Sequence, residues 1–162
     1  MSTQLSAYIS RANDIIGRST PIPADCGKLC GAACCQGDDA GMLLFPGEVA
    51  RLANVPNFRL VRIRYMDGRA WHLTCDGTCE RGVRPLSCRI FPLAPHVDKH
   101  GRITAVPDPR ARRMCPLATG EFLDRRFRRK VAKAFSLLAE EPRIFDFMRR
   151  LSRECDELQR FF

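Results

Sequence analysis

Long apolar segments are absent from this sequence, histidine is scarce, and no cysteine pair has the C-x2-C spacing. No apolar run approaches the roughly 20 residues that a membrane-spanning helix needs, so we expect no membrane partner. Residues 1–18 contain Asp14 and no continuous apolar stretch, so we expect no secretory signal peptide. No two cysteines have the C-x2-C spacing of a zinc ribbon, and the three histidines (His72, His96 and His100) are more typical of structural or surface positions than of ligands. These absences favour a protein of the reducing cytoplasm that contains no zinc ribbon.

Cysteine, in contrast, is abundant, with nine among 162 residues. Four of them, Cys26, Cys30, Cys34 and Cys35, lie within ten residues of one another. Thiolates packed this closely repel each other unless a cation lies between them or they become oxidised. An odd number of cysteines suits a fully oxidised secreted monomer poorly, and clustered cysteines in the cytoplasm bind metal more often than they form disulfides. The pattern therefore favours a metal site over a disulfide scaffold.

Eight of the nine cysteines form the candidate ligand set. The ninth, Cys155, is in register with Met148 and Leu151 in a helical pattern, so we expect a buried core thiol there. Thiolates without histidine suit zinc or an iron–sulfur cluster, and neighbouring side chains such as Cys34 and Cys35 should reach different metals or different corners of a cluster. The candidate ligands are Cys26, Cys30, Cys34, Cys35, Cys75, Cys79, Cys88 and Cys115.

Three arginines stand beside the later cysteines of this set. An anionic thiolate site that is buried needs hydrogen-bond donors around it, and Arg81, Arg84 and Arg89 could supply them. We expect Arg84 and Arg89 to contact the cofactor; the alternative is that these arginines face water, as arginines usually do.

The formal net charge of +9 at pH 7 suggests an acidic partner such as nucleic acid. Eight ionised thiols would offset much of this charge before the metal is counted. Basic residues crowd one predicted helix, residues 121–138, but no aromatic residue is placed between the charges in a way that suggests base stacking. A solvated helix face is the favoured interpretation, and nucleic-acid binding there is possible but not favoured.

The pattern predicts an α+β fold in a single domain that spans residues 1–162. An amphipathic helix is expected up to Ile16, and the cysteine run follows it. The middle of the chain is expected to contain a turn, an apolar run, a short helix, two β-hairpins and an irregular arm. The C-terminal part, residues 120–162, should be helical.

Several boundaries follow from the same pattern. The turn covers residues 36–41, the apolar run 42–45 and the short helix 46–53, with Glu48 near the positive end of that helix. The first hairpin pairs residues 58–65 with 69–74 around an Asp67-Gly68 turn. The second pairs strands near 89–97 and 102–106, the irregular arm is 107–113, and the two C-terminal helices contain Phe122 to Leu138 and Ile144 to Leu158.

The cysteine spacing resembles that of the CxxCxxCC family, the YkgJ-type cysteine cluster proteins. The resemblance covers about residues 26–116, and its most specific part is the run RPLSCRIFP at residues 84–92, which is followed later by Cys115-Pro116. It implies that the eight matching cysteines chelate zinc or iron, or hold an iron–sulfur cluster. The chain departs from the family in having C-x3-C-x3-C-C where the family has C-x2-C-x2-C-C, and in having Gly82 where the family tends to have tyrosine.

Three functions follow as hypotheses. The first is a cytoplasmic metal-binding protein whose cysteines hold an iron–sulfur cluster or zinc in a structural, redox or metal-handling role. The second is a zinc-stabilised module that binds nucleic acid or protein through the basic helix 121–138. The third is a metal-dependent protein-modifying enzyme, since flagellin lysine methylases have a similar cysteine motif. The chain has no Gly-rich strand–turn–helix signature for a methyl-donor nucleotide, so the sequence does not favour a methylase.

Overall fold

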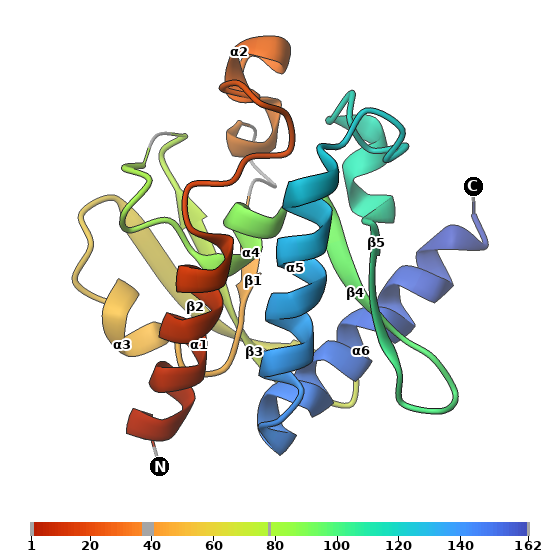
Figure 1. Ribbon diagram of the computed structural model, residues 1–162. Coiled ribbons are helices and arrows are strands. Elements are labelled where there is room, and N and C mark those ends of the chain that lie inside the picture. The colour runs from red at the N-terminus through yellow and green to blue at the C-terminus, as the bar shows by residue number, and fades with distance from the viewer. Residues whose placement is uncertain (1, 37–40, 78, 162) are drawn as a thin grey trace.

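The fold combines a three-stranded sheet and a separate β-hairpin with helices from the two ends of the chain (Figure 1). The computed structural model describes residues 2–36, 41–77 and 79–161. Helices at the N-terminus and at the C-terminal end confirm the predicted α+β class. In chain order the elements are α1 (Ser2–Ile16), α2 (Gly27–Cys30), η1 (Ala33–Cys35), β1 (Met42–Leu44), α3 (Val49–Leu52), β2 (Phe58–Tyr65), β3 (Gly68–Cys75), α4 (Leu86–Ile90), β4 (Leu93–Val97), β5 (Ile103–Pro107), η2 (Pro109–Arg113), α5 (Arg125–Leu138) and α6 (Pro142–Gln159).

The first sheet has the strand order β1-β3-β2, and both pairs are antiparallel. Its hairpin matches the predicted one, but the turn is one residue earlier than expected, because Tyr65 pairs with Gly68 and leaves Met66 and Asp67 as the turn residues. Met66 takes the left-handed conformation there, with φ of 51°. The apolar run at residues 42–45 supplies β1, which pairs with the edge of β3 opposite to β2 and so adds a third strand to the sheet.

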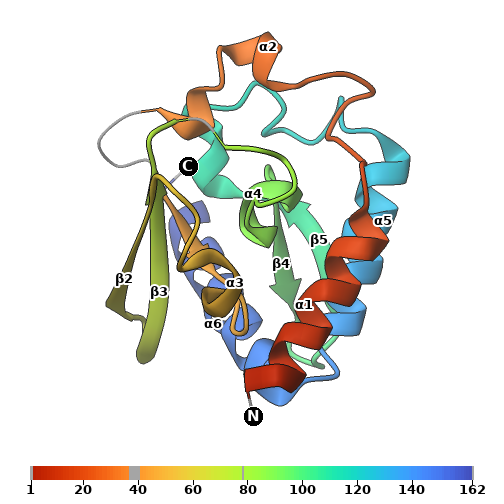
Figure 2. The same cartoon turned by 90° about the vertical axis from the view of Figure 1, so that its left-hand side faces the viewer.

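The main core is formed where α1, α5 and α6 pack on the two sheets (Figure 2). Its largest fully buried side chains include Phe45 and Phe147, whose rings meet edge to face with centroids 5.2 Å apart. Cys155 is 2% exposed in this core, so the prediction of a core thiol is confirmed. A second, smaller cluster of Leu44, Leu52 and Leu73 fills the space between α3 and the sheet.

Three predicted boundaries were wrong. The second hairpin consists of β4 and β5, and residues 89–90, where its first strand was predicted to begin, belong to the helix α4 instead. The arm at 107–113 contains the 3-10 helix η2. The helix expected from Phe122 begins at Arg125, because the side chain of Asp124 accepts a hydrogen bond from the backbone N–H of Phe127 and so caps the helix; Phe122 is left exposed. Of the predicted turn at 36–41, residues 37–40 lie outside the described part of the chain.

The basic side chains of α5 lie on its solvent-facing side, opposite a buried row that includes Phe127, Val131 and Phe135. This arrangement agrees with the solvated face that the sequence predicted. Across the ranges that the structure describes, no helix is both long and apolar enough to cross a membrane.

Candidate metal centre

Four separate segments bring the eight candidate cysteines to one end of the molecule, the upper end in Figure 1. The segment of α2 and η1 carries the first four. The end of β3 and the loop after it carry Cys75 and Cys79, α4 carries Cys88, and the loop after η2 carries Cys115. All nine cysteines are free thiols, and Cys155 lies apart in the core. The fold therefore gathers the residues that the sequence singled out.

Cys26, Cys30 and Cys115 form a first set, which we name the outer thiol group. Burial and then the charges of Cys115 and Cys30 raise the pKa of Cys26. Burial likewise raises the pKa of Cys115, with Cys30 adding to it. The Sγ of Cys30 lies 3.8 Å from the backbone oxygen of Cys26. These mutual effects place the three thiols near one another although 85 residues separate Cys30 from Cys115 in the sequence.

The other five cysteines form the pocket thiol group, which lines a pocket of about 470 Å³. Apolar side chains, among them Phe58, Leu73 and Phe91, form much of the remaining wall. The members of the pocket thiol group are Cys34, Cys35, Cys75, Cys79 and Cys88. A pocket of this kind, apolar with a few convergent polar groups, is the usual form of a ligand or cofactor site.

Two of these thiols interact closely. The Sγ atoms of Cys34 and Cys35 are 3.9 Å apart. The hydrogen bond between them raises the pKa of Cys34 and lowers that of Cys35, and Arg84 lowers the pKa of Cys35 further. Burial raises the pKa of Cys88, and the charges of Cys35 and Cys79 add to the effect. Of the pair, Cys35 is therefore the thiol that ionises more readily, and a bound cation would favour ionisation of both.

Arg84 is the cationic side chain that interacts with the pocket thiol group. Burial opposes its charge, but a hydrogen bond to the thiol of Cys79 and the nearby Cys35 and Cys88 raise its pKa above the ordinary value. This contact agrees with the expected donor role of Arg84 toward sulfur.

The two other arginines of this region contact α1 and the residues that follow it. Arg89 donates from Nη1 to Oδ1 of Asn13 at 2.7 Å and from Nη2 to the backbone oxygen of Gly17. Arg81 donates to the backbone oxygen of Ser19 at 2.7 Å. These bonds tie the segment of Cys88 to α1, which is a structural role. The assignment of Arg89 to the cofactor stays a prediction.

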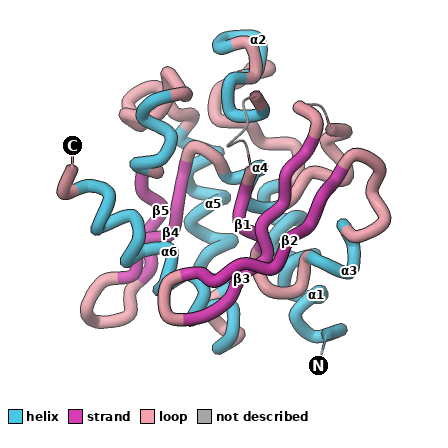
Figure 3. The backbone as a smooth tube through the Cα atoms, turned by 180° about the vertical axis from the view of Figure 1, so that it is seen from behind, coloured by secondary structure: helices cyan, strands magenta, loops and turns pink. Residues whose placement is uncertain are grey.

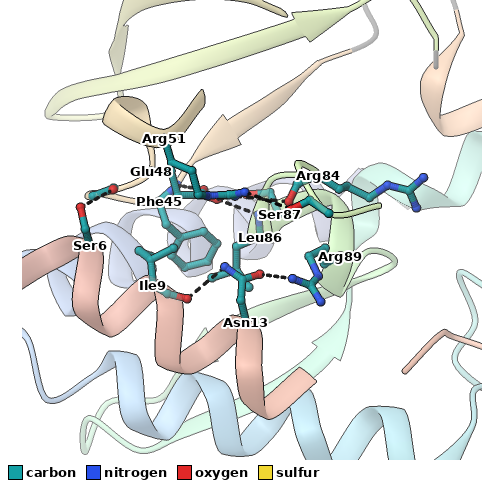
Figure 4. Close-up of polar contacts among 12 residues, drawn as sticks. Ser6, Ile9, Asn13, Phe45, Glu48, Arg51, Arg84, Leu86, Ser87 and Arg89 are labelled. Carbon is teal, nitrogen blue, oxygen red and sulfur yellow. Dashed lines mark hydrogen bonds and ion pairs between the residues drawn. The ribbon is translucent and has the colours of Figure 1, made fainter. Parts of the chain in front are cut away.

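The segment of Cys88 is also held from the other side, by Glu48 (Figure 4). This carboxylate is fully buried, and its two oxygens accept hydrogen bonds from the backbone N–H groups of Phe45, at 2.9 Å, and Leu86, at 2.7 Å. The side chain of Ser87 donates to the backbone oxygen of Leu43. Glu48 therefore joins β1 to the start of α4, two residues before Cys88.

The sequence pointed to a different role for Glu48. It stands directly before α3 but makes no capping hydrogen bond with that helix. Its side chain accepts hydrogen bonds from two backbone donors, one of them 38 positions along the chain, and forms an ion pair with Arg51 at 3.7 Å. An acidic residue shortly after the apolar run 42–45 and before the largely apolar helix of residues 49–52 was the available signal, since a carboxylate at such a place is buried only with partners.

The eight thiols gather without converging on a single point. Within the described residues, no three side chains of Cys, His, Asp or Glu lie close enough together to hold one metal ion. The segment with the first four cysteines is held locally, for example by the bonds Ala32 N–H to Gly27 O and Cys35 N–H to Ala32 O. Gly31 and Ala32 both take the left-handed conformation between Cys30 and Cys34. The two residues turn the chain back on itself here, and at Ala32 this conformation costs about 1 kcal/mol.

We expect substitutions of Arg84 and Arg89 to have different effects, one mainly on the retention of bound metal and the other mainly on the stability of the fold. Arg89→Ala should lower the free energy of unfolding by about 1.5–3 kcal/mol, because hydrogen bonds that involve a charged group contribute that much. Arg84→Ala should instead speed the loss of bound metal to a chelator, with a smaller change in stability. Urea unfolding and chelator release, measured on both variants, test this split. Equal effects of the two substitutions on both measurements would contradict it.

None of the three histidines is among the described residues that line the pocket, although the ring of His72 lies against Gly41 of its wall. His96 lies 3.7 Å from Asp156 of α6, and His72 pairs with Leu43 and Val61 inside the first sheet. These positions agree with the structural or surface roles expected for them.

Comparison of the chain with protein-family models, with curated proteins and with solved structures finds no match. The resemblance to the CxxCxxCC family therefore stays a prediction that rests on the cysteine spacing and the RPLSCRIFP run.

Proposed function

We propose that this protein binds a metal centre through cysteine thiolates, in the reducing cytoplasm. The observation that carries the proposal is that four separate segments bring eight of nine cysteines to one end of the fold, while the ninth is buried elsewhere. A fold gains nothing from collecting eight free thiols unless they share a ligand, because ionised thiols repel each other.

The donor set fits zinc or an iron–sulfur cluster and excludes the hard cations. Thiolate ligands select zinc, copper(I) and iron–sulfur clusters, whereas magnesium and calcium prefer oxygen. One tetrahedral zinc ion needs four sulfurs about 2.3 Å from one point. The described thiols do not converge in this way, and five of them line a pocket of about 470 Å³. A polynuclear cluster spreads its ligands over several metal atoms, so this spacing favours an iron–sulfur cluster over a single zinc ion.

The surroundings of the pocket suit a redox or metal-handling role. Arg84 would donate to sulfur, and hydrogen bonds to sulfur together with solvent exposure set the potential of such a cluster. The apolar wall of Phe58, Leu73 and Phe91 would limit the access of water. A bound cluster would supply electron transfer, and the residues of this chain would hold it and shape its surroundings.

Anaerobic purification with metal analysis and an absorption spectrum tests the proposal. We expect a brown protein that contains iron and acid-labile sulfide in equal amounts. A colourless protein with stoichiometric zinc would support thiolate binding and overturn the choice of a cluster. A protein that binds neither metal, and neither takes up zinc nor accepts a reconstituted cluster, would overturn the proposal as a whole.

A further inference from the structure

The hairpin of β2 and β3 carries a second feature that the metal centre does not explain. Cross-strand pairing places Arg62 opposite Trp71 and Arg64 opposite Arg69. Residues directly opposite each other in an antiparallel pair point to the same face, and so do residues two apart in one strand. Three arginines and the one tryptophan of the protein therefore form a two-by-two array, which we name the arginine–tryptophan face.

This face borders hollows in the surface. One, of about 580 Å³, is lined by Arg62, Arg64 and Arg69. Another, of about 420 Å³, is lined by Arg62, Arg69 and Trp71 together with Arg143 and Arg150 of α6. The second hollow lies where β1 ends, since β1 pairs with residues 71–73 of β3 and leaves residues 68–70 without a β1 partner.

The acidic side chains around the hollows are already paired. Asp67 binds Arg153 at 2.8 Å, Asp146 binds Arg150 at 3.1 Å, and Glu141 binds Arg143 at 2.9 Å. The side chains of Arg62, Arg64 and Arg69 are exposed and form no hydrogen bond or ion pair with the described residues. The three charges of the arginine–tryptophan face are therefore uncompensated.

We propose that the arginine–tryptophan face binds single-stranded nucleic acid. Guanidinium groups match the geometry of phosphate, and proteins that bind single strands combine a basic groove with aromatic side chains on which bases stack. Arg62, Arg64 and Arg69 would contact phosphates, and Trp71, half-buried beside Arg62, would stack on a base.

This surface is distinct from the basic helix that the sequence singled out. The hairpin lies in front in Figure 3, and α5 lies in front in the opposite view of Figure 1. Trp71 is two residues from Arg69 but seven and nine residues from Arg64 and Arg62 in the chain, so the strand pairing is what brings these two arginines to the aromatic ring. The proposal also does not depend on the metal centre, which lies at the end of the hairpin away from its turn.

The single tryptophan makes the test direct. The full-length protein, purified with its metal, is titrated with a 12-nucleotide oligothymidylate while the fluorescence of Trp71 and the anisotropy of a labelled oligonucleotide are followed. We expect quenching of Trp71 upon binding. Three phosphate contacts on a single strand predict a slope of about −2 for log affinity against log salt.

Two matched triple variants decide which surface binds. R62Q/R64Q/R69Q should weaken binding by about tenfold or more and remove most of the salt dependence. R125Q/R128Q/R129Q, which removes the same charge from α5, should leave the affinity within about threefold of the unaltered protein. Absence of quenching would overturn the proposal, as would an equal loss in both variants. Binding to vesicles of anionic lipid without binding to the oligonucleotide would overturn it as well and would leave the hairpin arginines as a membrane contact.

Discussion

Replacement of Glu48 by alanine is expected to lower the free energy of unfolding at pH 5 by about 2–6 kcal/mol, because two buried backbone N–H groups lose their acceptor at about 1–3 kcal/mol each. These donors belong to Phe45, directly after β1, and to Leu86, at the start of α4. The loss should extend to the metal centre, since Leu86 is two residues from Cys88. Urea unfolding with and without metal measures both effects.

The same loss should depend on pH. Burial raises the pKa of Glu48 to about 7 from an ordinary value of 4.5, although the N–H groups of Leu86 and Phe45 and the charge of Arg51 act to lower it. The folded protein therefore holds a proton that the unfolded chain releases between these two values. The stability contributed by the protonated carboxyl is fully present below pH 4.5 and is lost as the pH rises through 7. We expect the difference between the unaltered protein and Glu48→Ala to shrink by up to about 3 kcal/mol between pH 5 and pH 8, at about 1.4 kcal/mol per pKa unit.

Glu157→Ala is the matched control, because Glu157 is an exposed glutamate on α6. It should change the stability by no more than about 0.5 kcal/mol at either pH. If Glu48→Ala were as mild as this control, the carboxylate would not be what joins β1 to α4.

Replacement of Cys88 by serine is expected to remove most of the bound metal and to lower the thermal midpoint of the metal-loaded protein. Cys88 lies in α4, whose start is held by Glu48, and it lines the pocket with four other thiols. A thiolate in such a held segment is a fixed ligand, whereas serine is a far weaker ligand for zinc or iron. Metal bound only by the folded state stabilises that state, and structural zinc contributes about 10–16 kcal/mol of apparent binding free energy. Metal analysis and thermal unfolding measure the two effects.

Cys155→Ala separates this effect from the general consequence of removing a cysteine. Cys155 is 2% exposed in the core, and burial raises its pKa to about 12, so it remains a thiol that packs as a small apolar side chain. The variant should keep its full metal content while losing about 1–2 kcal/mol of stability from the cavity that it creates. The assigned ligand set would be wrong if the Cys88→Ser variant kept its full metal content, or if the Cys155→Ala variant lost its metal.

The elements that the sequence predicted well are those with a clear period. α1, α5, α6 and the first hairpin have apolar residues at helical or alternating spacing, and one side of each packs on the core. Residues 89–90 were predicted as the start of a strand near 89–97. They belong to α4, whose N-cap residue is Pro85 and whose first residue, Leu86, donates a backbone hydrogen bond to Glu48, far away in the sequence.

The candidate site divides in the same way. The cysteines and Arg84 could be picked from the sequence, because residue type and spacing carry the chemistry of metal ligands. The hydrogen-bond partners of Arg89 could not be predicted from the sequence, since Asn13 and Gly17 are more than 70 positions earlier in the chain. The pairing of Trp71 with Arg62 depends in turn on the register of the hairpin.

The sequence by itself determined the α+β class, the thiol chemistry of one end and the core position of Cys155. These properties depend on local periodicity and on residue type, which a linear chain carries within a few residues. Only the three-dimensional structure decided that Glu48 supports α4 and that three arginines without an ion-pair partner among the described residues lie beside the tryptophan. The first depends on a contact between distant segments, which forms when burial of the core brings them together, and the second on the register of the hairpin.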